Sequence, residues 1–153
     1  MAMNNFEELV HSVYQHLELD GREALDDEEP IHGLEFEHHG MEVKMIETSE
    51  APDARALVFC VFGRLPAEIE LQGLRKLMEI NLFLGNDGNT IFGRDPDSGQ
   101  VNFRFEQNLA ETTIEGFVDA LDQIAGQAAE WRENFFLGDD AEETPEFSAF
   151  QFA

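Results

Sequence analysis

Three histidines, His32, His38 and His39, are the side chains in this sequence most suited to bind a metal ion. His38 and His39 are adjacent, and in an extended strand neighbouring side chains point to opposite faces. The two imidazoles should therefore diverge, and no pair of cysteines accompanies them. We expect exposed histidines of a hairpin here, with no metal site and no cofactor.

A second candidate for metal binding is the acidic segment 95–99, Asp-Pro-Asp-Ser-Gly, which is followed at a distance by Glu106. An EF-hand calcium loop needs a glycine at its sixth position, and Gln100 stands there. Phe103 and Phe105 alternate with polar residues, which is typical of a strand. We therefore expect a β-turn at residues 95–99, because Asp, Pro, Ser and Gly are the residues that turns favour.

No motif for nucleophilic catalysis or phosphate binding is present. The single cysteine, Cys60, lies in the apolar run 58–62 without a basic or histidine neighbour, so a buried, unreactive thiol is expected. The sequence contains neither a Gly-x-Ser-x-Gly elbow nor a glycine-rich loop leading to Lys-Ser or Lys-Thr. Carboxylate pairs arise by chance among 33 acidic residues. We predict a binding protein and not an enzyme.

The charge of the chain restricts its partners. It has 33 Asp and Glu against 9 Lys and Arg, a formal net charge of −24 over 153 residues. Like charges repel, so nucleic acid and anionic membranes are not expected partners. A basic protein is a permitted partner, and an acidic inhibitor that mimics nucleic acid remains an alternative function. No 18-residue apolar run and no signal-peptide pattern occur, and we expect a cytoplasmic protein.

Hydrophobic periodicity predicts three helices and five strands. Apolar residues recur every three or four positions in helices and every second position in half-buried strands. The predicted helices are 4–19, 66–84 and 112–135, and the predicted strands are 34–37, 41–45, 56–62, 90–92 and 101–106. The order helix, three strands, helix, two strands, helix indicates an α+β domain with a mainly antiparallel five-stranded sheet, spanning residues 1–137. Residues 138–153 form an acidic tail with three phenylalanines.

Two predicted elements have unusual apolar patterns. Residues 56–62 are apolar without alternation, so we expect a central strand that is covered on both faces. The helix 66–84 has two apolar stripes, whereas a surface helix needs only one. The first stripe consists of Ile69, Gly73, Leu77, Ile80 and Leu84, and the second consists of Leu71, Leu74, Met78 and Leu82. The second stripe favours a contact with another subunit, and the alternative is a helix deep in the core.

Residues 74–85 read Leu-Arg-Lys-Leu-Met-Glu-Ile-Asn-Leu-Phe-Leu-Gly. A glycine-containing loop, a short strand, the Asp-Pro-x-x-Gly turn at 95–99 and an alternating strand follow. This helix is similar to the Leu-Leu-x-x-Asn-Leu helix of type III secretion chaperones of the CesT/Tir-chaperone type, and the same elements follow it there. The order of elements resembles that family over residues 4–136.

The resemblance implies a bacterial, cytoplasmic homodimer without enzymatic activity. Such a chaperone binds the N-terminal region of a secreted effector, keeps it extended and helps to deliver it to the secretion apparatus. The resemblance also implies that the second helix supplies the dimer contact, here through Leu71, Leu74, Met78 and Leu82. The effector contacts that it implies on the first helix and the sheet are Leu9, Val13, Leu34, Phe36, Val43, Phe103 and Phe105.

Overall fold

The computed structural model describes residues 3, 5–19, 32–49, 53–84 and 90–137. The acidic tail that the sequence predicts at residues 138–153 lies outside these ranges. The described helices are α1 (Phe6–His16), α2 (Glu70–Asn81) and α3 (Ile114–Asn134), with 3-10 turns at Ala67–Ile69 and Leu109–Glu111. The strands are β1 (Gly33–His38), β2 (Met41–Ser49), β3 (Arg55–Arg64), β4 (Ile91–Arg94) and β5 (Gln100–Asn108).

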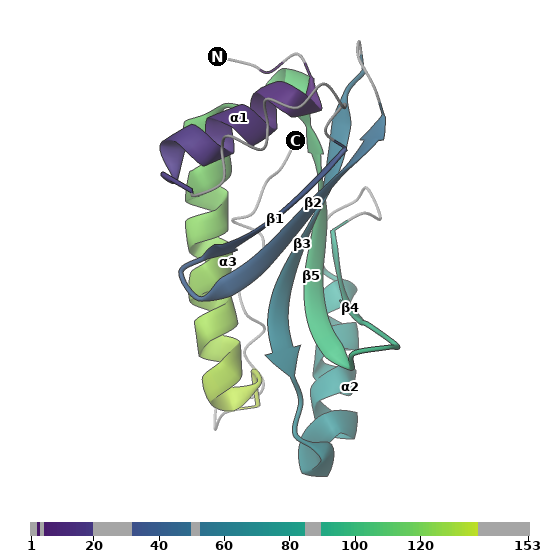
Figure 1. Ribbon diagram of the computed structural model, residues 1–153. Coiled ribbons are helices and arrows are strands. Elements are labelled where there is room, and N and C mark those ends of the chain that lie inside the picture. The colour runs from purple at the N-terminus through teal and green to yellow at the C-terminus, as the bar shows by residue number, and fades with distance from the viewer. Residues whose placement is uncertain (1–2, 4, 20–31, 50–52, 85–89, 138–153) are drawn as a thin grey trace.

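The five strands form one antiparallel sheet in the order β1-β2-β3-β5-β4. Helix α3 runs along one face of the sheet, and α1 crosses α3 (Figure 1). Helix α2 lies beside β4, which is an edge strand of the sheet. The predicted α+β class, element order and antiparallel sheet are confirmed. No helix in the described part of the chain is long and apolar enough to cross a membrane.

The core lies between the sheet and the helices α1 and α3. Phe62, Phe92, Phe103 and Trp131 form an aromatic cluster there, in which the Phe92 and Phe103 ring centroids are 5.0 Å apart. Strand β5 alternates as predicted, with Phe103 and Phe105 turned inward. Helix α3 begins after Thr113, whose hydroxyl accepts a hydrogen bond from the Gly116 N–H at 3.1 Å. The cap thus provides an acceptor for one of the backbone N–H groups in the first turn, which have no acceptor within the helix.

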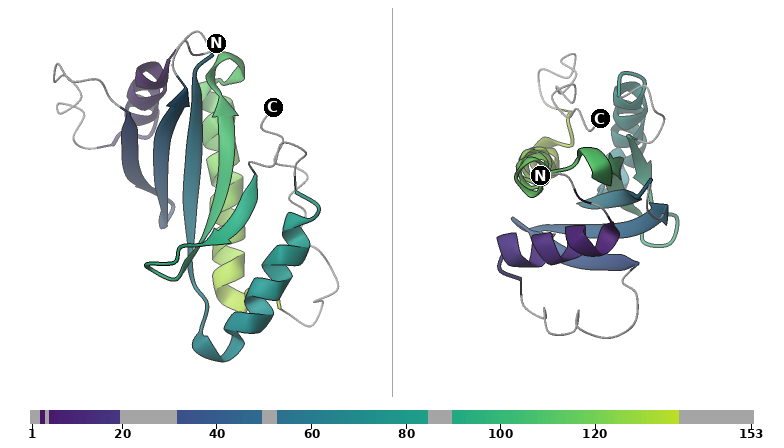
Figure 2. Two further views of the ribbon diagram at one scale, coloured as in Figure 1. Left: turned by 90° about the vertical axis from the view of Figure 1, so that its right-hand side faces the viewer. Right: turned by 90° about the horizontal axis from the view of Figure 1, so that it is seen from above.

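Strand β3 is central, as predicted, but it is covered on one face only. Val58 and Cys60 are buried against the helices, whereas Leu57 and Phe59 on the other face are half-buried. In the left view of Figure 2 this other face is turned toward the viewer, and no helix of the described chain lies across it. The expectation of cover on both faces is wrong because α3 packs against one face of β3 only (Figure 2). On the other face, Lys44 and Arg104 flank Phe59 in register.

Two contacts fix α2 at the edge of the sheet. A Cβ atom on Gly73 would lie 2.4 Å from Cδ2 of Leu65, so a larger residue at this position would force the Leu65 side chain to move. At the other end, Asn81 accepts a hydrogen bond from the Phe92 N–H at 2.7 Å and donates one to the Phe92 carbonyl at 3.0 Å. The Asn81 amide therefore satisfies the backbone of edge strand β4 as a neighbouring strand would.

Replacing Asn81 should detach α2 from β4. We expect Asn81→Ala to lower the free energy of unfolding by about 1–3 kcal/mol, because two part-buried backbone groups lose their partners. Urea unfolding at one fixed protein concentration measures this change. The control is Gln72→Ala on the exposed side of the same helix, which should stay within about 0.5 kcal/mol of wild type. Equal losses for the two variants would refute the role given to Asn81.

The buried thiol gives a second prediction. Cys60 is fully buried in β3, and this burial raises the pKa of its thiol. Because the thiolate is the reactive form, the native protein should react with a thiol-specific disulfide reagent far more slowly than the urea-unfolded protein. Absorbance of the released thiol follows both reactions, and rapid labelling of the native protein would contradict the burial.

Candidate functional site

Most of the large apolar side chains that are exposed in the described part of the chain lie on α2 and the turn after it. The first stripe of the helix faces inward, with Leu77 and Ile80 buried. The second stripe faces outward, and Leu74 in it is half-buried. Four exposed side chains follow one another along this surface: Leu71 at 64%, Met78 at 74%, Leu82 at 79% and Phe83 at 73% exposure. The alternative of a helix deep in the core is therefore wrong.

Phe83 belongs to this surface although the helical periodicity did not place it in the second stripe. Helix α2 ends at Asn81, and Leu82 and Phe83 in the turn that follows are both exposed. Of the five large apolar side chains that are exposed among the described residues, only Ile46 lies elsewhere. We call Leu71, Leu74, Met78, Leu82 and Phe83 the α2 surface.

A second candidate site is a hollow on the open face of the sheet. Its volume is about 440 Å³, and strands β2 to β5 and the turn between β4 and β5 line it. Ile46, Phe59, Val61 and Ile91 supply apolar lining, and Lys44, Arg94 and Arg104 supply positive charge. Glu42 and Asp95 also lie on its wall. We call this the open-face hollow.

The cations of the open-face hollow are notable in so acidic a chain, because they are three of only nine lysines and arginines. Lys44 lies 3.5 Å from a carboxylate oxygen of Glu35, and Arg94 lies 3.8 Å from one of Glu70. These are exposed ion pairs, which contribute little to stability. The Nε atom of Arg104 is buried and has no hydrogen-bond partner among the described residues. The hollow therefore combines three cations with the acidic side chains of Glu42 and Asp95.

The residues that the resemblance implied for effector contact lie mostly on the other side of the sheet. Six of the seven are buried within the protomer: Leu9, Val13, Leu34, Val43, Phe103 and Phe105. Phe36 is half-buried against the same core. Alternation along a strand distinguishes two faces but does not tell which one the helices cover, and here they cover the phenylalanine-rich face. The strand residues that alternate with these phenylalanines form the exposed face of the sheet.

The turn at residues 95–99 forms as predicted and joins β4 to β5. The carboxylate of Asp95 accepts hydrogen bonds from the backbone N–H groups of Asp97 at 2.8 Å and Ser98 at 3.3 Å. These bonds favour the charged form and lower the pKa of Asp95. Gly99 has a φ of +74°, which suits glycine. The Asp95 carboxylate therefore stabilises the turn, and the turn forms one wall of the open-face hollow.

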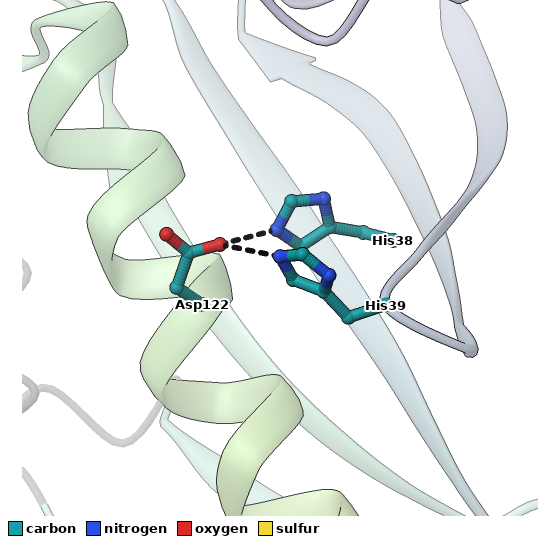
Figure 3. A group of neighbouring side chains, drawn as sticks. All are labelled: His38, His39 and Asp122. Atoms are coloured by element: carbon teal, nitrogen blue, oxygen red, sulfur yellow. Dashed lines mark hydrogen bonds and ion pairs between the residues drawn. The ribbon is translucent and has the colours of Figure 1, made fainter.

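The two adjacent histidines meet, contrary to expectation. Nε2 of His38 lies 2.6 Å and Nε2 of His39 lies 3.2 Å from the same oxygen of Asp122 in α3 (Figure 3). The expected divergence is wrong because His39 is not extended: it has a φ of +49° in the two-residue turn between β1 and β2. His32 lies at the opposite end of β1, 3.4 Å from Glu47.

Known proteins share this architecture. The chain resembles one in the structure of the ExoT–SpcS complex from Pseudomonas aeruginosa, with a TM-score of 0.51 and 21% identity over 82% of this chain and 95% of that one. It also resembles a chain of the ExsC–ExsE complex, with a TM-score of 0.55 and 19% identity over 87% and 95% of the two chains. At these identities the likeness shows the fold. No curated protein matches the chain in sequence.

A family model supplies the assignment. The model of the Tir chaperone protein (CesT) family matches residues 9–132, which is well over half of the 153 residues. The match includes α2 with its Asn81 contact, the open-face hollow and nearly all of α3. The resemblance found in the motif at residues 74–85 is confirmed. This chain belongs to the Tir chaperone protein (CesT) family.

Proposed function

We propose that this protein is a homodimeric type III secretion chaperone. In this role it binds the N-terminal segment of a secreted effector in the bacterial cytoplasm, keeps that segment extended and presents it to the secretion apparatus. It has no catalytic task. The observation that carries the proposal is the α2 surface, an apolar stripe that the described chain leaves open to solvent. Family membership supports it, and both structural neighbours are named as two-protein complexes.

The α2 surface suits a twofold contact with a second copy. Full burial of a Leu, Met or Phe side chain is worth about 1.5–3 kcal/mol. In a twofold contact both copies bury the same side chains, so each residue contributes its burial free energy twice. This gain offsets an association cost of about 4–15 kcal/mol. Monomeric proteins rarely expose contiguous apolar patches of this kind without a partner. A second copy that covers Leu71, Met78 and Leu82 would bury most of the large apolar side chains that are exposed in the described part of the chain.

Charges placed in the α2 surface should separate the subunits. We expect Met78→Glu combined with Leu82→Glu to yield a monomer of 17.3 kDa in light scattering, where wild type gives twice that mass. Both side chains are exposed in the protomer, so the fold should survive. The control is Ile46→Glu, which changes an exposed apolar residue on the sheet and should leave the dimer intact. A monomeric wild type, or a dimer that tolerates both glutamates, would contradict this contact.

The open-face hollow suits an extended polypeptide. Its apolar lining can receive alternate side chains of a bound segment, and Lys44 and Arg104 can pair with its carboxylates or carbonyl oxygens. At the hollow these cations offset part of the repulsion that the net charge of −24 exerts on an acidic segment. We place the effector segment here, on the face opposite the predicted contacts Val43, Phe103 and Phe105.

Substitutions in the hollow should weaken effector binding without affecting dimerisation. We expect Ile46→Ser and Lys44→Glu each to raise the dissociation constant of an N-terminal effector segment about tenfold, equivalent to about 1.4 kcal/mol. Calorimetry with an effector segment that co-purifies with the protein measures this dissociation constant. Arg64→Glu is the control, because it makes the same change in charge at an exposed site outside the hollow.

The salt dependence of binding distinguishes a chaperone from an acidic inhibitor. Affinity that rests on buried apolar side chains should change little between low and high salt, whereas a nucleic-acid mimic should lose its basic partner steeply. Failure to recover any effector segment, with steep salt dependence toward a basic protein, would overturn the chaperone proposal.

A further inference from the structure

A cluster of three potential ligands lies apart from both surfaces described above. His38 ends β1, His39 lies in the turn to β2, and Asp122 comes from α3. Figure 3 shows both imidazoles aimed at one carboxylate oxygen, with Nε2 to Oδ1 distances of 2.6 Å and 3.2 Å. One ligand atom from each residue lies within 4.8 Å of the other two. Segments about 84 residues apart in the sequence thus converge on one point.

The backbone of the turn makes this convergence possible. His39 and Gly40 both have positive φ, +49° and +76°, as a tight two-residue hairpin turn requires. Asparagine is the residue most favoured at the first of these positions, and a left-handed conformation costs a residue with a Cβ about 1–2 kcal/mol. The turn conformation therefore brings the His39 ring to the same carboxylate oxygen as the His38 ring.

The donor set matches one class of ion. Two imidazole nitrogens and one carboxylate oxygen suit zinc and its neighbours among the divalent transition metals, whereas calcium and magnesium prefer oxygen alone. Tetrahedral zinc with bonds of about 2.0–2.1 Å spaces its ligand atoms about 3.3 Å apart. The His39 to Asp122 distance of 3.2 Å already fits. The His38 contact of 2.6 Å is a hydrogen bond, and it would lengthen as the ion replaces the proton.

The cluster combines a fixed side with an open side. The His38 side chain is 8% exposed, which restricts its motion, whereas His39 is 67% and Asp122 is 47% exposed. An ion can therefore enter from solvent and keep a water molecule as its fourth ligand. We propose that His38, His39 and Asp122 bind one zinc-class divalent metal ion, which links the β1–β2 hairpin to α3. This site is independent of the chaperone role.

Titration of the full-length, chelator-treated protein with zinc tests the proposal by calorimetry. We expect one ion per chain, and at least tenfold weaker binding in His39→Ala and in Asp122→Asn. Both side chains are exposed, so circular dichroism should confirm that these variants stay folded. The matched control is His32→Ala, which removes a histidine paired with Glu47 at 3.4 Å outside the cluster and should leave zinc affinity unchanged.

Two further measurements separate the site from loose attraction of cations to an acidic surface. Cobalt(II) bound in place of zinc should show visible absorption of low-coordinate geometry, and His39→Ala should remove it. A large excess of magnesium should not displace zinc, because the site contains two nitrogen ligands. Zinc affinity that is the same in wild type, His39→Ala and Asp122→Asn would overturn the proposal. So would full displacement of zinc by magnesium.

Discussion

The arrangement of this chain depends on the position of α2. Gly73 lets the helix approach Leu65, and Asn81 ties its end to the backbone of β4. With one stripe held against the sheet in this way, the other stripe must point outward. No second layer of the described chain covers it, so the apolar residues there are exposed to solvent. The same contact closes the edge of β4 at Phe92, where another strand would otherwise add.

One face of the sheet is covered by helices and the other is open to solvent. Phenylalanines of β3, β4 and β5 pack with Trp131 of α3 on the covered face. The alternating strand residues lie on the open face, where apolar and positively charged side chains line a hollow. In a chain of charge −24, a third of the lysines and arginines gather on this face. The exposed face therefore carries apolar side chains together with charged side chains of both signs, since Glu42 and Asp95 line the same hollow.

The histidine cluster shows how one residue's backbone changes side-chain geometry. Adjacent residues of a strand diverge, and that rule is correct for β1 as far as His38. The turn places His39 in the left-handed region, which swings its ring back beside that of His38 at a centroid distance of 4.2 Å. Asp122 then meets both rings because α3 passes over this end of the hairpin.

The sequence by itself determined the order of the elements, the antiparallel sheet, both stripes of α2 and the turn at residues 95–99. Each of these depends on periodicity or local turn chemistry, which neighbouring residues encode. Only the tertiary structure decided which face of the sheet the helices cover, and so it placed Leu34, Val43, Phe103 and Phe105 in the core. It also decided that Phe83 is exposed together with Leu82, and that His38 and His39 share Asp122. The reason is that these features depend on contacts between segments far apart in the chain, which local patterns do not specify.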